Sequence, residues 1–175
     1  MMSNAFSRLG RRVSMALGLG RLTANTDEKA STHTVQAALA GGELRSDVPL
    51  LQQVGFHSRP LPGSDVVVLF QAGDRSRGVA VATGDQRSYP RDLQPGDACL
   101  YHVTTGARVW LKADGSISIS TSGPLNVTAS EAAFNCPITS TGDISAKGDV
   151  LAGKISLTNH EHPVQAAPGT TGAPE

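Results

Sequence analysis

The 175-residue chain is poor in the aromatic residues that usually fill a large protein core. Only 4% of its residues are aromatic and 39% are hydrophobic, whereas it contains 19 glycines and 10 prolines. This composition argues against one large core within a single chain and favours small β-units that share a core between subunits. We therefore expect the chain to bury its apolar residues together with other copies of itself.

The chain also lacks an excess of charge, a cysteine framework and a long apolar run. Its 15 basic and 15 acidic residues cancel, so no overall charge favours nucleic acid. Cys99 and Cys136 show no spacing typical of a disulfide framework, and we interpret both as small buried apolar residues. No stretch approaches the roughly 20 apolar residues of a membrane-spanning helix. We expect a chain that is soluble before it assembles.

The N-terminal segment, residues 1–33, is predicted to lie outside the folded part. Residues 1–21 carry four arginines and no acid, and apolar residues recur in them at roughly helical spacing. The apolar stretch 13–19 is short and interrupted by Ser14 and Gly18, so we interpret the segment as basic and amphipathic and not as a signal peptide. Residues 22–33 are polar and resemble a linker, and the folded part is expected to begin near Thr34.

Residues 34–105 alternate short apolar runs with strong turn signals. The run 66–70 is continuously apolar between Gly63 and Gly73, which predicts a strand buried on both faces, and residues 79–82 are its expected hairpin partner. The apolar runs are residues 35–39, 50–56, 66–70, 79–82 and 98–103. Five or so short strands in this length predict a small barrel of the OB type over residues 34–105.

Residues 106–158 form a loose repeat of short apolar couplets separated by glycines. The couplets have a period of two, as in Val109 and Leu111, and only six charged residues lie between Asp114 and Thr158. One or two modest apolar residues per strand cannot offset an ordering cost of about 1–2 kcal/mol per residue in a single chain. Three intertwined chains can, because each apolar side chain then meets copies of itself. We predict a trimeric, intertwined, triple-stranded β-helix.

His160 and His162 close this repeat just before Pro163. On a β-strand, residues two apart point to the same face, so both imidazoles would aim at one spot. Two ligands are too few for a stable metal site, but three chains would supply six nitrogens, enough for an octahedral shell. The alternative is a pair of solvated histidines near a frayed end. His33, His57 and His102 share no ligand spacing, and we interpret them as surface or strand residues.

The sequence shows no catalytic machinery, which argues against an enzyme. It has neither a nucleophile elbow nor a prominent carboxylate pair, and no room for an added wall-degrading domain. An OB-type nucleic-acid-binding module with a repetitive β tail is the main alternative function, since Arg108 and Trp110 could stack on a base. With so few aromatic residues, a structural Trp110 is the favoured interpretation.

Several segments of the chain together form a distinctive pattern: residues 53–63 (QVGFHSRPLPG), 65–70 (DVVVLF), 73–82 (GDRSRGVAVA), 91, 93–97 (LQPGD) and 100–101. These segments resemble the Mu-like baseplate assembly protein V family, the central spike proteins of contractile phage tails. Residues 159–164 and 168–172 resemble the same family more loosely.

This resemblance implies an all-β homotrimer and a mechanical function. It implies OB barrels around a three-fold axis, then a triple β-helix that tapers to an apex, residues 159–175, where His160 and His162 of three chains hold one iron ion. Sheath contraction would drive this spike through the host outer membrane. The expected partners are the baseplate hub and tail tube, with no nucleic acid, and the expected location is the virion, after a soluble stage in the host cytoplasm. The tail 164–175 would fold back as a cap or stay loose.

Overall fold

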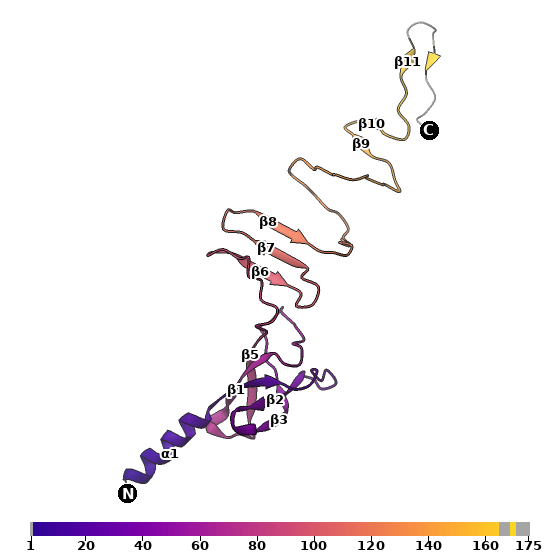
Figure 1. Cartoon of the computed structure of the whole chain (residues 1–175). Helices are drawn as coiled ribbons and strands as arrows, with labels where there is room; N and C mark the ends of the chain where they lie inside the picture. The colour runs from indigo at the N-terminus through magenta and orange to yellow at the C-terminus, as the bar shows by residue number, and fades with distance from the viewer. Residues whose placement is uncertain (1, 165–168, 171–175) are drawn as a thin grey trace. The chain divides into compact units, whose positions relative to one another are not determined.

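The computed structural model describes residues 2–164 and 169–170, and it divides into two compact units, Met1–Leu125 and Asn126–Glu175. The fold is mostly β, as predicted, with one α-helix in the described part of the chain (Figure 1). Its regular elements are α1 (Met2–Met15), β1 (Leu17–Leu22), β2 (Thr34–Leu39), η1 (Ala40–Gly42), β3 (Leu44–Pro49), β4 (Asp65–Phe70), η2 (Gln71–Gly73), β5 (Gly78–Gly84), β6 (Ala98–Tyr101), β7 (Arg108–Leu111), β8 (Ile117–Ser120), β9 (Leu151–Ala152), β10 (Ile155–Ser156), β11 (Pro163–Val164) and β12 (Gly169–Thr170).

The basic N-terminal segment forms α1, which ends at Met15. Its apolar stripe stays exposed, with Phe6 at 72%, Leu9 at 60% and Val13 at 67% of their full accessibility. Arg75 closes the helix by donating from Nη1 to the Met15 carbonyl at 3.3 Å, because the last carbonyls of a helix lack partners within it. No helix in the described part of the chain combines the length and apolarity needed to cross a bilayer.

Five strands form one antiparallel sheet in the order β3-β2-β1-β4-β5. The sheet curls (Figure 1), and its two edge strands approach each other just beyond β3. There Leu50 bridges Ala80 of β5 in parallel fashion, and the Leu51 amide donates to the Ala80 carbonyl at 2.9 Å. This curled sheet therefore brings its edges together and wraps around its own core.

The core of the curled sheet is small and aliphatic. β4 shows the period expected of a sheet with one buried face, since Val66 and Val68 are buried while Leu69 is 48% exposed. The prediction that this strand is buried on both faces is therefore wrong for the chain as described, because an antiparallel sheet around one core leaves its other face outward. The buried apolar residues are Leu22, Val35, Ala37, Leu39, Val48, Leu50, Val66, Val68, Phe70 and Ala80.

The expected start of the folded part near Thr34 is wrong, because β1 lies at the centre of the curled sheet. β1 pairs with β2 on one side and with β4 on the other, and its Leu22 is only 2% exposed. Two glycines of β1, Gly18 and Gly20, allow it to pack closely between its neighbours β2 and β4. A Cβ on Gly20 would lie 2.2 Å from the Ala38 carbonyl oxygen, so only glycine allows β1 and β2 to approach this closely.

Two of the strands that the sequence predicts for the barrel also differ from those in the structure. The hairpin of residues 66–70 with 79–82 is confirmed by the β4–β5 pairing. The edge strand is β3, however, and the apolar run 50–56 contains no strand in the described structure. Residues 98–101 form β6, which pairs with β7 and so belongs to a three-stranded sheet, β6-β7-β8, outside the curled sheet.

The second unit holds little regular structure in one chain. β9 and β10 pair as a short hairpin, and β11 pairs with β12, so the described part of the tail folds back on itself. The rest of the predicted tail, residues 165–168 and 171–175, lies outside the described residues. Between β8 and β9 the described chain contains no strand (Figure 1), although the sequence predicts several. Strand hydrogen bonds need a neighbouring edge, and the described residues of the chain offer this segment none.

The apolar residues of this repeat are left on the surface of the single chain. Ile144 is 76% exposed, Val127 is 73% exposed and Ile138 is 67% exposed. Cys136, expected to be buried, is exposed here as well, whereas Cys99 is partly buried in β6. The alternating apolar residues predicted from the sequence are therefore present, but among the described residues of one chain they do not pack into a core.

Candidate functional site

His160 and His162 lie between β10 and β11 and not on a strand as expected. Their rings nevertheless lie close, with centroids 5.1 Å apart and planes at 86°. The turn of residues 157–159, which follows β10, leads into the pair, and in it the His160 amide donates to the Ser156 carbonyl at 3.2 Å. Pro163 begins β11 instead of ending a strand run. The structure therefore keeps both imidazoles at one place by local geometry other than the predicted strand pleat.

The hydrogen bond of His160 suits a metal ligand. Its Nδ1 lies 2.9 Å from the Ser156 carbonyl oxygen. A carbonyl only accepts, so Nδ1 carries the proton and donates, and Nε2 of the neutral ring keeps its lone pair. Metal-binding histidines commonly donate their second nitrogen in this way, which fixes the tautomer and the ring. The arrangement of His160 and His162 within one chain is thus compatible with a metal ion that several chains share.

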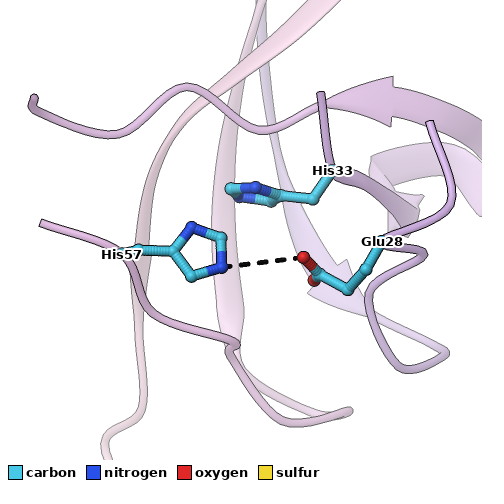
Figure 2. Close-up of side chains that lie close together, drawn as sticks. All are labelled: Glu28, His33 and His57. Carbon is cyan, nitrogen blue, oxygen red and sulfur yellow. Dashed lines mark ion pairs between the residues drawn. The ribbon is translucent and has the colours of Figure 1, made fainter. Parts of the chain in front are cut away.

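A second group of ligand-type side chains lies in the first unit, where no spacing of residues along the chain predicts one. Glu28 and His33 come from the segment between β1 and β2, and His57 comes from the segment between β3 and β4 (Figure 2). One ligand atom from each of the three side chains lies within 4.8 Å of the others. His57 is exposed, as expected of a surface residue, and His33 is half-buried. The sequence did not predict that the two would meet, because the fold joins positions that share no ligand spacing.

Charge and hydrogen bonding hold the Glu28 carboxylate in place. Oε2 lies 3.6 Å from His57 Nε2, and Oε1 accepts from Thr26 Oγ1 at 2.7 Å. Arg59 Nε lies 3.1 Å from the same Oε1. The hydrogen bond from Thr26, followed by the positive charge of Arg59, lowers the pKa of Glu28 below its ordinary value, and this outweighs the opposing effect of desolvation. Glu28 is therefore an ionised acceptor at neutral pH.

The two histidines of this cluster contact each other directly. Their ring centroids are 4.7 Å apart with the planes at 86°, an edge-to-face arrangement (Figure 2). His33 Nε2 is buried and has no hydrogen-bond partner among the described residues. Buried polar atoms are nearly always paired, so this nitrogen marks a position where a partner is expected.

Trp110 is held by its own chain. Its Nε1 donates to Asp97 Oδ2 at 2.9 Å, and the Arg108 guanidinium lies 4.3 Å from the ring centroid. The Lys112 ammonium lies 4.7 Å from the same centroid. These contacts agree with the structural interpretation of Trp110, because the side chains that could hold a base already hold the indole.

Comparison with known proteins decides the family. A sequence model of the family described as Bacteriophage Mu Gp45, N-terminal, matches residues 20–87. The baseplate puncturing device gp45 of Escherichia phage Mu is 33% identical over 155 residues, which cover 87% of this chain and 77% of that protein. The chain belongs to the bacteriophage Mu Gp45 family. The family resemblance noted in the sequence is thereby confirmed.

The Mu Gp45 family match coincides with the curled sheet. It begins within β1 and ends just after β5, so it includes the end of the strand that the sequence placed in the N-terminal amphipathic segment and linker. Glu28, His33 and His57 all lie inside the matched residues, whereas His160 and His162 lie beyond them. The family model therefore covers the curled sheet, and the long pairwise match extends the relationship to most of the chain.

Proposed function

We propose that the protein is the central spike of a contractile phage tail baseplate, a homotrimer driven through the host outer membrane when the sheath contracts. The relative in phage Mu is named as a baseplate puncturing device, which supports a puncturing role and a place in the virion. Family membership makes the chain a structural protein and not an enzyme. The baseplate hub and tail tube are the proposed partners, and the host cytoplasm is the proposed site of synthesis before assembly.

The exposed apolar repeat of the second unit is the observation that carries this proposal. Large apolar residues recur from Val127 to Leu157, and the described ones are each at least 45% exposed. A monomer rarely leaves so continuous an apolar surface in water, and its unpaired strands would invite uncontrolled pairing. Three intertwined copies of the segment supply both the missing strand neighbours and the missing core. An intertwined triple-stranded β-helix of residues 106–158 satisfies both requirements.

The curled sheet supports an OB-type barrel at the other end of the spike. Five antiparallel strands wrap around one core, and the Leu50–Ala80 bridge joins the two edges. A five-stranded, partly open barrel of this kind is the OB architecture. Three such barrels around the axis would give the rigid base through which the baseplate pushes. The barrel is proposed to begin at β1, not at Thr34.

The test of this function is the mass of the full-length protein in solution. We expect light scattering to give three times the 18.1 kDa of one chain. The reason is that the apolar repeat has no internal partner, so the folded form is the assembled one. A protein that stays at the mass of a single chain at all concentrations contradicts the spike, whatever its family.

At the tip, His160 and His162 of three chains are proposed to hold one iron ion. When bound, the ion would tie three chains together where the repeat becomes too narrow for a packed core. The chain's own contribution is to orient the rings: the Ser156 carbonyl holds His160 Nδ1 and leaves Nε2 for a ligand bond. Six imidazole nitrogens disfavour zinc, which prefers four ligands.

Removing both histidines is expected to remove this metal. Elemental analysis of purified wild-type protein should find about one iron per three chains, and His160→Ala with His162→Ala should abolish it. The change His102→Gln is the matched control, since His102 lies in the first unit and is held by Thr105 at 3.0 Å from its Nδ1. Iron retained by the double variant would contradict the tip site and leave the trimer untouched.

A further inference from the structure

We propose that Glu28, His33 and His57 form a second metal site, one in each chain, for a divalent transition ion of the zinc type. This site lies beside the curled sheet and is separate from the proposed tip. It also goes beyond the proposed spike function, which needs no metal in the first unit. The argument depends on the spacing of the ligand atoms, on the unpaired nitrogen of His33, and on the two segments that hold the ligands.

The spacing of the ligand atoms already approaches that of a tetrahedral site. Zinc binds nitrogen and oxygen at about 2.0–2.2 Å, so two ligands on one tetrahedral ion lie about 3.3–3.6 Å apart. His57 Nε2 and Glu28 Oε2 lie 3.6 Å apart, and all three ligand atoms fall within 4.8 Å of one another. The two distances from His33 are no longer than 4.8 Å, and small rotations of the side chains would bring them into range. Two imidazoles and one carboxylate form a recognised zinc ligand set with water as the fourth ligand.

His33 Nε2 explains why an ion is the expected occupant. This nitrogen is buried and unpaired among the described residues, and His33 faces the other two side chains (Figure 2). A bound cation would satisfy it, because the lone pair of a neutral imidazole is a metal ligand. Glu28 and His57 are exposed, so an ion can enter the site from solvent without opening the fold.

The segment that carries Glu28 and His33 is closed by its own backbone. The Asp27 amide donates to the Thr34 carbonyl at 3.0 Å, and the Thr34 amide donates back to Asp27 at 2.9 Å. Glu28 and His33 are the residues immediately inside this bridge. They are therefore brought side by side before any ion binds, which lowers the ordering cost of binding.

The segment that carries His57 is pinned in a similar way. Gln52 Nε2 donates to Ser58 Oγ at 2.7 Å, and the Ser58 amide donates to Gln52 Oε1 at 2.9 Å. Arg59 then reaches across to Thr26, donating from Nε to its Oγ1 at 2.9 Å and from Nη2 to its carbonyl at 3.0 Å. Hydrogen bonds thus connect the two segments next to the ligands, and a bound ion would add a further cross-link between them.

Arg59 also determines the class of ion. Its guanidinium and the Thr26 hydroxyl use Glu28 Oε1 and leave Oε2 toward the histidines. A carboxylate whose charge is shared with arginine is a poor partner for calcium or magnesium, which need several oxygen ligands. Two imidazoles suit zinc, copper, nickel or iron instead. Zinc is the probe of choice because it needs four ligands and carries no redox chemistry.

The site is tested in the full-length His160→Ala, His162→Ala protein, in which the proposed tip can contribute nothing. Zinc chloride is titrated calorimetrically into the metal-stripped protein, and cobalt is substituted to read coordination from its visible absorption. We expect one zinc per chain and a cobalt spectrum typical of four-coordinate sites. Adding His57→Gln should weaken zinc binding by at least about 100-fold, since loss of a direct ligand exceeds the 10–100-fold effect of losing a group behind it.

His57→Gln is chosen because the side chain is 58% exposed, so the fold should survive the change. Circular dichroism verifies this, and Glu28→Gln, which keeps the size of the side chain, should also weaken binding. His102→Gln in the same background is the control and should bind zinc as the parent does. Zinc binding that is equal in the parent and in His57→Gln overturns the site, as does a parent that takes up no zinc. Neither result bears on the trimer.

Discussion

Replacing Ile144 by aspartate should dissociate the assembled protein. Ile144 is 76% exposed in one chain, so in a monomer the change would cost no more than about 0.5 kcal/mol. In an intertwined trimer the same side chain is covered by partner chains. Three uncompensated carboxylates would then be buried, each costing on the order of 3–5 kcal/mol. This exceeds what a modest repeat can offset.

The adjacent Ser145→Asp is the matched control. It adds the same charge one residue along, where the strand alternation of the proposed β-helix would point the side chain to the opposite face. Light scattering and thermal unfolding of both variants compare the two faces directly. Ile144→Asp protein with wild-type mass and melting temperature would show that the apolar repeat is not an interface, and equal loss in both variants would show that charge alone is responsible.

Truncating Leu22 should destabilise the curled sheet strongly. Leu22 is 2% exposed on β1, the central strand, and changing a buried leucine to alanine costs about 2–5 kcal/mol. Urea unfolding followed by circular dichroism should show a lower midpoint with little change in slope. If Leu22 lay in a polar linker, as the sequence alone suggested, its truncation would leave the urea midpoint almost unchanged.

Leu19→Ala is the control on the same strand. Leu19 is 60% exposed and lies on the outer face of β1, so its truncation should cost well under half as much. The pair therefore measures burial while strand, residue type and size of the change stay constant. Equal costs for Leu19 and Leu22 would contradict the inward orientation of β1.

The strands that could be predicted from sequence are those whose signal is local. The β4–β5 hairpin was predictable because an apolar run, a polar turn and a second apolar run follow one another. β1 was missed because two of its six residues are glycine, which weakens any strand signal. Gly20 is required by the close approach of β2, and a Cβ on Gly18 would lie 2.8 Å from the Phe70 ring of β4. Both contacts appear only after folding.

The two histidine pairs differ in the same respect: the proximity of one pair could be predicted from the sequence, and that of the other could not. His160 and His162 are neighbours in the chain, so their proximity could be predicted, although a turn and not a strand brings it about. His33 and His57 are separated by β2 and β3, and no spacing rule connects them. Their rings meet because those strands pair and return the chain to the same edge of the sheet.

By itself, the sequence determined the family, the mostly β character of the chain and the apolar period of its second unit, since composition and period-two alternation are written along the chain. Tertiary structure alone decided that β1 is central, that β6 leaves the curled sheet, and that Glu28, His33 and His57 converge. The physical reason is common to all three: pairing between distant strands depends on which edges and apolar faces remain available after the local hairpins have formed. The spacing of residues along the chain does not show which edges and faces will pair.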